Sequence, residues 1–267
     1  MSTVLTAGAF VYLALCLLML TTQRSLQYRP DPRPMDPVRV GLVQAKAITV
    51  ETSDSERIVL WWIEPRSPQH PVWLYLHGNG ANLEARAARF NYLTRDGAGL
   101  LAVSWRGYGG SSGTPTERGL RHDARAAYDW LSHRVSPERV LLFGESLGTT
   151  LAVMLAADVP VRALVLDSSF SSVRDVASHA YPWLPVDLLL LDPLRADLAA
   201  PNVSVPVQQF HCTEDPVIPI EFAERLRALL PRAQPIIRHD ARCHVPSVAS
   251  FEPALTAFVR TVLATGR

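Results

Sequence analysis

The stretch that most constrains the fold runs from residue 139 to residue 158 and reads RVLLFGESLGTTLAVMLAAD. Residues 140–143 are β-formers, Gly-Glu-Ser-Leu-Gly follows at 144–148, and an Ala- and Leu-rich helical pattern comes next. A serine at the centre of G-x-S-x-G, between a buried strand and a helix, is typical of a nucleophile elbow. The glycines fit such a turn because a Cβ at either position would press on the neighbouring strand or helix. The pattern therefore predicts that Ser146 is a nucleophile.

Length and composition favour one compact α/β domain after an N-terminal appendage. The chain has 267 residues, 48% of them hydrophobic, and a formal net charge of +1. Chains of this length can still share a single large core. The sequence has no basic run and no stripe of alternating aromatic and basic residues, so it lacks the electrostatic pattern of a nucleic-acid-binding surface. We therefore expect no binding of DNA or RNA.

The N-terminus carries a long apolar segment. Residues 4–20 contain no charged side chain, and their length is at the lower edge of a membrane-spanning helix. No Lys or Arg precedes the segment and no Ala-x-Ala site follows it, so an uncleaved anchor over residues 1–23 is favoured over a cleaved signal peptide. Arg24, Arg29 and Arg33 follow the segment and favour a cytoplasmic domain by the positive-inside rule, although a short span with an uncharged N-terminus can also direct export.

A proline-rich spacer separates this anchor from the folded domain. Four prolines between residues 28 and 37 exclude a helix and predict an extended chain. The expected organisation is an anchor (1–23), a spacer (24–45) and a catalytic domain (46–267). Because such a spacer is a poor platform for packing, we expect the domain to stay active without the anchor.

Strand and helix patterns alternate through the rest of the chain. An antiparallel strand pair is predicted at residues 46–51 and 57–64, and a buried strand at 72–76. Further strands are predicted at 100–104, 163–166, 205–210 and 235–238, and helices at 117–133, 221–230 and 251–263. This alternation predicts a mostly parallel central sheet with helices on both faces.

A serine hydroxyl needs a base that takes its proton and an acid that orients the base. After G-x-S-x-G these partners are expected in the order acid and then histidine, at the carboxyl ends of later strands. Asp215 and His244 have the right order and position. Glu214 and Asp167 remain alternative acids, and His239 is the alternative base.

Two backbone N–H groups are expected to stabilise the oxyanion. Leu147, which follows the nucleophile, supplies one of them. The His-Gly-Asn-Gly loop at 77–80 supplies the other, at Asn79, and its glycines let the backbone approach the substrate.

Several motifs of the chain resemble those of one enzyme family. They are LHGNGAN (76–82), WRGYGGSSG (105–113), GESLG (144–148), YPWLP (181–185) and DPVIP (215–219). Together they resemble membrane-anchored α/β-hydrolases related to monoacylglycerol-lipase-type and protein-depalmitoylase-type serine hydrolases. The resemblance implies the α/β-hydrolase fold, the triad Ser146, Asp215 and His244, and hydrolysis of esters or thioesters without a cofactor or metal. The expected substrate is therefore a small-molecule or lipid acyl ester.

Three questions stay open at this level. Residues 168–200 are placed as a short lid, whose apolar side chains either pack inward or line an acyl pocket and contact the bilayer. An amidase or peptidase on the same fold, and a non-enzymatic binding protein with a hydrolase fold, are the rival functions. Activity on ester and amide panels separates the first rival, and labelling of the nucleophile separates the second.

Cys212 and Cys243 depart from the family pattern, because they stand beside the acid and base loops where glycines are common. Their loops must converge, so the two residues form either a disulfide or a pair of reduced buried thiols, as expected in a reducing cytoplasm. A disulfide would argue for export and against the topology drawn from the arginines. A zinc site that includes them is disfavoured, because adjacent residues on an extended chain point in opposite directions.

Overall fold

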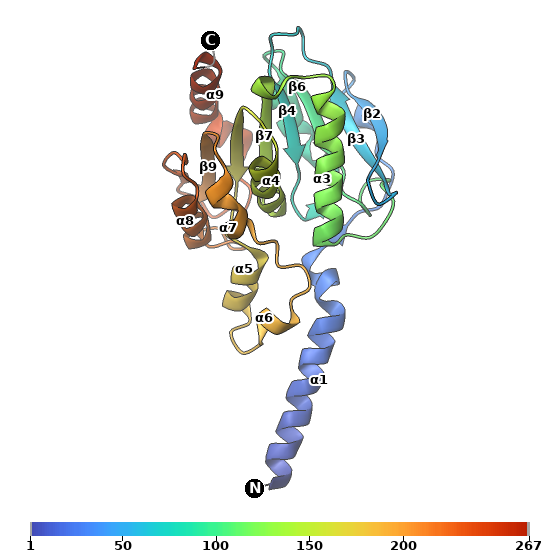
Figure 1. The fold of residues 1–267 in the computed structure, drawn as a ribbon, viewed down its shortest axis with the longest axis vertical. Helices are drawn as coiled ribbons and strands as arrows, with labels where there is room; N and C mark the ends of the chain where they lie inside the picture. The colour runs from blue at the N-terminus through green and yellow to red at the C-terminus, as the bar shows by residue number, and fades with distance from the viewer. Residues whose placement is uncertain (1, 266–267) are drawn as a thin grey trace.

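The computed structural model describes residues 2–265, and its centre is an eight-stranded sheet (Figure 1). The strands are β2 (Lys46–Glu51), β3 (Arg57–Ile63), β4 (Val72–Leu76), β6 (Gly99–Val103), β7 (Val140–Glu145), β8 (Ala163–Asp167), β9 (Val207–Cys212) and β10 (Ile237–His239). Their order across the sheet is β10-β9-β8-β7-β4-β6-β3-β2. β3 pairs antiparallel with β2 and β6, and the other neighbours pair in parallel. The predicted strands and the mostly parallel sheet are confirmed.

Helices cover both faces of the sheet, as predicted. One face carries α3 (Glu117–Ser132), α4 (Leu147–Asp158), α7 (Ala196–Ala199) and α8 (Ile220–Leu229), and the other carries α2 (Ala87–Thr94) and α9 (Val248–Ala264). Short 3-10 turns lie at Pro37–Val40, Leu83–Arg86, Pro137–Arg139 and Ala200–Asn202. Alternate residues of β4 serve the two faces: Leu74 and Leu76 pack under α3 and α4, whereas Trp73 and Tyr75 pack under α2.

The N-terminal helix α1 (Ser2–Gln27) projects away from the sheet, at the end of the molecule opposite the C-terminus (Figure 1). Its part Val4–Gln27 is long and apolar enough to cross a membrane, judged by length and composition. The helix continues past the boundary expected at residue 23. Its last residues, 24–27, therefore lie within the segment that was expected to be an extended spacer.

The spacer packs against the domain instead of hanging free. Tyr28 and Leu42 are buried, and β1 (Arg29–Pro30) pairs in parallel with β5 (Gly80–Ala81). The backbone N–H of Gly109 also donates to the carbonyl oxygen of Asp31 at 2.7 Å. The prolines keep this segment extended, and an extended backbone can still bond to the loops beside it.

The lid contains α5 (Val173–Ala180) and α6 (Val186–Leu189), which lie beside the last turns of α1 (Figure 1). The Gln23 side chain joins the two parts: its Nε2 donates to Leu189 O at 2.9 Å, and its Oε1 accepts from Leu191 N at 2.8 Å. Arg24 forms an ion pair with Asp192 at 2.8 Å. Deleting residues 1–23 would remove Gln23 from this contact, so the packing does not support the expectation that the anchor is dispensable.

Candidate active site

Ser146 lies at the sharp turn between β7 and α4, with φ 48° and ψ −118°. This backbone conformation is strained for a residue with a side chain, and it presents the hydroxyl above the edge of the sheet. The crowding predicted for the flanking glycines is present. A Cβ on Gly148 would collide with the Leu76 carbonyl oxygen, and one on Gly144 would come within 2.7 Å of the Thr149 Cα atom.

Three of the predicted residues lie in one hydrogen-bonded row. Ser146 Oγ is 2.7 Å from His244 Nε2, and His244 Nδ1 is 2.8 Å from Asp215 Oδ2. Asp215 Oδ1 in turn accepts from the backbone N–H groups of Val217 and Ile218, at 2.8 and 2.9 Å. The Asp215 side chain is fully buried, whereas that of His244 is 24% exposed. The carboxylate is thus held in place, and the imidazole can reach a substrate.

The alternative acids and base lie elsewhere. Asp167 forms a buried ion pair with Arg89 instead of contacting the histidine ring. Glu214 is exposed at the start of the turn after β9. His239 stacks on Phe210, with ring centroids 6.4 Å apart, and burial lowers the pKa of its imidazole. None of these three residues joins the row at Ser146.

The two expected oxyanion donors line the same cavity as the serine. Leu147 is the first residue of α4, where the backbone N–H has no partner within the helix. Asn79 is held by its side chain and carbonyl group: Arg29 N donates to its Oδ1 at 2.9 Å, and Tyr108 Oη donates to its backbone oxygen at 2.7 Å. The proline-rich spacer and the loop after β6 therefore position the loop that carries Asn79.

A buried charge cluster beside the nucleophile was not foreseen from the sequence. Glu145 forms an ion pair with Arg86 at 2.7 Å, and Arg89 contacts both Glu145 and Asp167. Burial raises the pKa of Glu145, but Arg86 and Arg89 outweigh this effect and bring it to about 2. Arg89 also donates to the carbonyl oxygen of Pro246, at 2.9 Å, in the loop that carries the histidine. The sequence signal that could have indicated this cluster is a pair of arginines, three residues apart, after the His-Gly-Asn-Gly loop.

Cys212 and Cys243 form a disulfide, with Cα atoms 5.7 Å apart. Cys212 ends β9 and is fully buried, and Cys243 directly precedes His244. The bond therefore joins the loop of the acid to the loop of the base. Both sulfurs are engaged in it, so they are not available as metal ligands. Within residues 2–265, no cluster of three or more His, Cys, Asp and Glu side chains is placed to hold a metal ion.

Thiol titration of the denatured, unreduced protein is expected to find one free thiol, that of Cys16, and three after reduction. The bond closes a loop with a sequence separation of 31, and by the chain-entropy model such a loop stabilises a fold by roughly 3–4 kcal/mol. The Cys212→Ser/Cys243→Ser variant should therefore melt at a lower temperature than the oxidised protein. Cys16→Ser, on α1, is the matched control and should leave the melting temperature unchanged. Three free thiols before reduction would contradict the disulfide.

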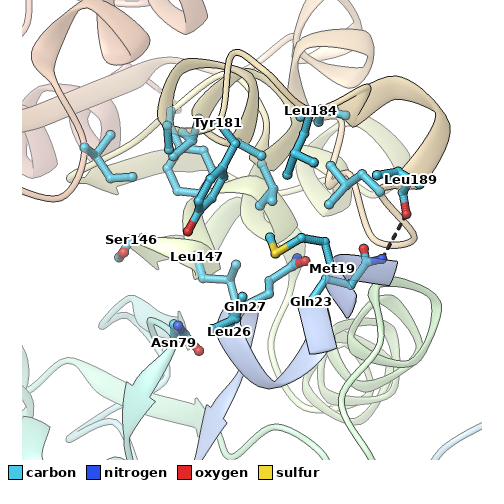
Figure 2. Close-up of a pocket in the computed structure, with 18 residues that line it drawn as sticks. Met19, Gln23, Leu26, Gln27, Asn79, Ser146, Leu147, Tyr181, Leu184 and Leu189 are labelled. Atoms are coloured by element: carbon cyan, nitrogen blue, oxygen red, sulfur yellow. Dashed lines mark hydrogen bonds between the residues drawn. The ribbon is translucent and has the colours of Figure 1, made fainter. Parts of the chain in front are cut away.

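An apolar cavity of about 330 Å³ opens beside Ser146, between the lid and the last turns of α1 (Figure 2). The lid contributes Val173, Val176, Tyr181, Leu184, Leu189 and Leu190. Other lid side chains point outward, with Trp183 51%, Leu188 85% and Leu191 49% exposed. The apolar side chains of the lid therefore divide into two groups. Some of its apolar groups line the cavity, and others form an exposed apolar surface beside α1.

Comparison with known proteins agrees with this architecture. The family model described as "alpha/beta hydrolase fold" matches residues 71–211. An uncharacterized protein of Mycobacterium tuberculosis is 39% identical over 209 residues, which cover 77% of this chain and 74% of that protein. The lysophosphatidylserine lipase ABHD12 of Rattus norvegicus is 30% identical over 214 residues, covering 73% of this chain and 54% of the lipase.

Solved structures share the fold at low sequence identity. An esterase of Pyrococcus furiosus superposes with a TM-score of 0.70 at 20% identity, covering 89% of this chain and 98% of the esterase. The family match spans more than half of the chain, and the sheet order and the serine turn described above fit it. The chain therefore belongs to the α/β-hydrolase fold family.

Proposed function

We propose that this hydrolase cleaves carboxylic esters or thioesters through an acyl-enzyme intermediate formed on Ser146. The row of Ser146, His244 and Asp215, open to an apolar cavity, is the observation that carries the proposal. An apolar cavity beside a nucleophile suits an acyl chain. The similarity to a lipase and to esterases supports ester substrates over amides.

In the proposed reaction His244 Nε2 takes the Ser146 proton as Oγ attacks the acyl carbon. The negative charge that develops on the carbonyl oxygen is stabilised by the N–H groups of Leu147 and Asn79. His244 then protonates the leaving alcohol or thiol, and an acyl-serine ester remains. Water, deprotonated by the same nitrogen, releases the acid and restores the serine. Asp215 keeps the proton of the neutral imidazole on Nδ1 and stabilises the imidazolium that forms at each step.

We also propose that α1 anchors the enzyme in a membrane and that its substrate is an acyl lipid. The support is the apolar length of α1 and the exposed Trp183, Leu188 and Leu191 beside it, because an apolar patch next to such a helix suits the bilayer. Tyr12 Oη donates to the Trp183 carbonyl oxygen at 3.1 Å, which holds the lid tip along the span.

The disulfide indicates on which side of the membrane the domain lies. The arginines after α1 favour the cytoplasm, but structural disulfides persist in oxidising compartments and are rare where thiols are kept reduced. The disulfide is the stronger indication, because the positive-inside signal here consists of three charges beside a single span. The domain is therefore proposed to face the oxidising side of the membrane. The thiol titration described above tests for the disulfide on which this proposal rests.

A fluorophosphonate probe tests the proposed chemistry, because it reacts covalently with an activated serine. The full-length protein in detergent should become labelled, and peptide mapping should place the label on Ser146. In parallel, the protein should hydrolyse dodecanoyl esters and thioesters faster than the matching amides. An unlabelled protein would favour a binding module, and faster turnover of amides would favour an amidase.

A further inference from the structure

The loop that carries His244 is held by side chains more than by its own backbone. Within residues 2–265, no backbone–backbone hydrogen bond involves residues 242–246. Segments held by few such bonds open more easily than the elements around them. The imidazole must nevertheless stay aligned with Ser146, because a displacement of about 1 Å can lower a rate by roughly 10²-fold. The groups that hold the backbone of His244 can therefore control the rate of the reaction.

The hydroxyl of Ser168 contacts this loop directly. Its Oγ donates a hydrogen bond to the backbone carbonyl oxygen of His244. A second acceptor, Asp167 Oδ1, lies 3.3 Å away, outside the roughly 2.5–3.0 Å that is usual between a hydroxyl and an oxygen acceptor. Because a hydroxyl has one proton, this proton goes to the His244 carbonyl group. Ser168 thereby holds the backbone of the histidine, whose two ring nitrogens are already bonded to Ser146 and Asp215.

Ser168 is itself fixed to the sheet. It directly follows β8 and is fully buried, and its backbone N–H donates to the Phe210 carbonyl oxygen on β9 at 2.9 Å. The carbonyl oxygen of the residue before it, Asp167, accepts from Ser146 N at 2.8 Å. Ser168 therefore has a fixed position relative to the nucleophile and to the strand that leads to the acid.

The backbone of Ser168 is strained, with φ 56°. A positive φ is unfavourable for a residue with a Cβ, whereas glycine adopts it readily. Residues strained in this way cluster at active sites. Ser146 has the same kind of backbone, with φ 48°, and the two serines follow paired residues of β7 and β8. Both side chains bond to His244, one at its ring and the other at its carbonyl group.

We propose that Ser168 is a positioning residue, which fixes the backbone of His244 so that the imidazole stays aligned for proton transfer. Because Ser168 is fully buried, it acts through the histidine and not on the substrate. Loss of its hydroxyl should therefore slow the chemical steps and leave substrate binding unchanged. This inference rests on the proposed ester hydrolysis by Ser146.

Ser168→Gly tests the inference, because glycine accepts the backbone conformation while the hydroxyl is lost. The full-length variant in detergent should hydrolyse a dodecanoyl ester with kcat about 10- to 100-fold below wild type and an unchanged KM. The rate of fluorophosphonate labelling should fall by a similar factor, and labelling should still reach one label per folded protein. Ser168→Ala should lose as much kcat, although it keeps the strain and should melt at a lower temperature than Ser168→Gly.

Ser55→Gly is the matched control, because Ser55 has φ 65° in the exposed turn between β2 and β3. It should keep the wild-type kcat. A folded Ser168→Gly protein with wild-type kcat, or with a change in KM alone, would rule out the positioning role and leave Ser146 as the proposed nucleophile. Failure of Ser168→Gly to fold would also reject this role and assign Ser168 to folding. If wild type hydrolysed neither dodecanoyl nor short-chain esters, the proposed function itself would fail.

Discussion

Ser146→Ala is expected to lower kcat for ester hydrolysis by about a million-fold, the scale seen when a triad nucleophile is removed. The change deletes the Oγ that lies 2.7 Å from His244 Nε2, so no acyl-enzyme can form. Residual activity would come from substrate binding and the oxyanion donors alone. Initial rates on a dodecanoyl ester, together with loss of fluorophosphonate labelling, measure the effect.

Ser132→Ala is the matched control, because Ser132 lies exposed at the end of α3. It should hydrolyse the ester at the wild-type rate. Circular dichroism and the melting temperature should be close to wild type for both variants, since neither removes buried apolar surface. Near-wild-type turnover by a folded Ser146→Ala protein would disprove the proposed mechanism.

Asp215→Asn is expected to lower kcat by about 10⁴-fold with little change in KM. The Val217 and Ile218 N–H groups both donate to Asp215 Oδ1 and need an oxygen there, so the new amide must turn its NH₂ group toward His244. Nδ1 then has to accept a hydrogen bond, and the ring proton moves to Nε2. In that tautomer the imidazole cannot take the serine proton. A pH–rate profile and kcat on the dodecanoyl ester measure the loss.

Asp167→Asn is the contrasting variant, because it places the same amide on the neighbouring strand. It should lower the melting temperature, since Arg89 loses one of its two buried charged partners and keeps only Glu145, but it should cost much less in kcat than Asp215→Asn. A large loss of kcat in Asp167→Asn with none in Asp215→Asn would move the acid to β8.

The sequence by itself determined the eight strands of the central sheet, the longer helices after β6 and their order, but not the short helices α2, α5, α6 and α7. The continuous apolar run of β4 and the helical pattern of α3 are local, so these elements could be located within a few residues. The turn at Ser146 was also foreseen, because the G-x-S-x-G pattern between a strand and a helix is local, although the group that would collide with a Cβ at Gly148 is the Leu76 carbonyl oxygen on β4. The order of nucleophile, acid and base could be read from the chain, since parallel strands carry their carboxyl ends to one edge of the sheet.

Only the tertiary structure decided which side chains meet. The loops after β9 and β10 converge at Ser146. This convergence decided that Asp215 and not Asp167 contacts the histidine, and that His244 and not His239 contacts the serine. Pairing between residues far apart in sequence leaves no periodic trace, so the Cys212–Cys243 bond remained one of two possibilities. The role of α1 was hidden for the same reason. Composition marks the helix as apolar, but its contact through Gln23 and Gln27 with a lid more than 160 residues later depends on how the domain folds back over it.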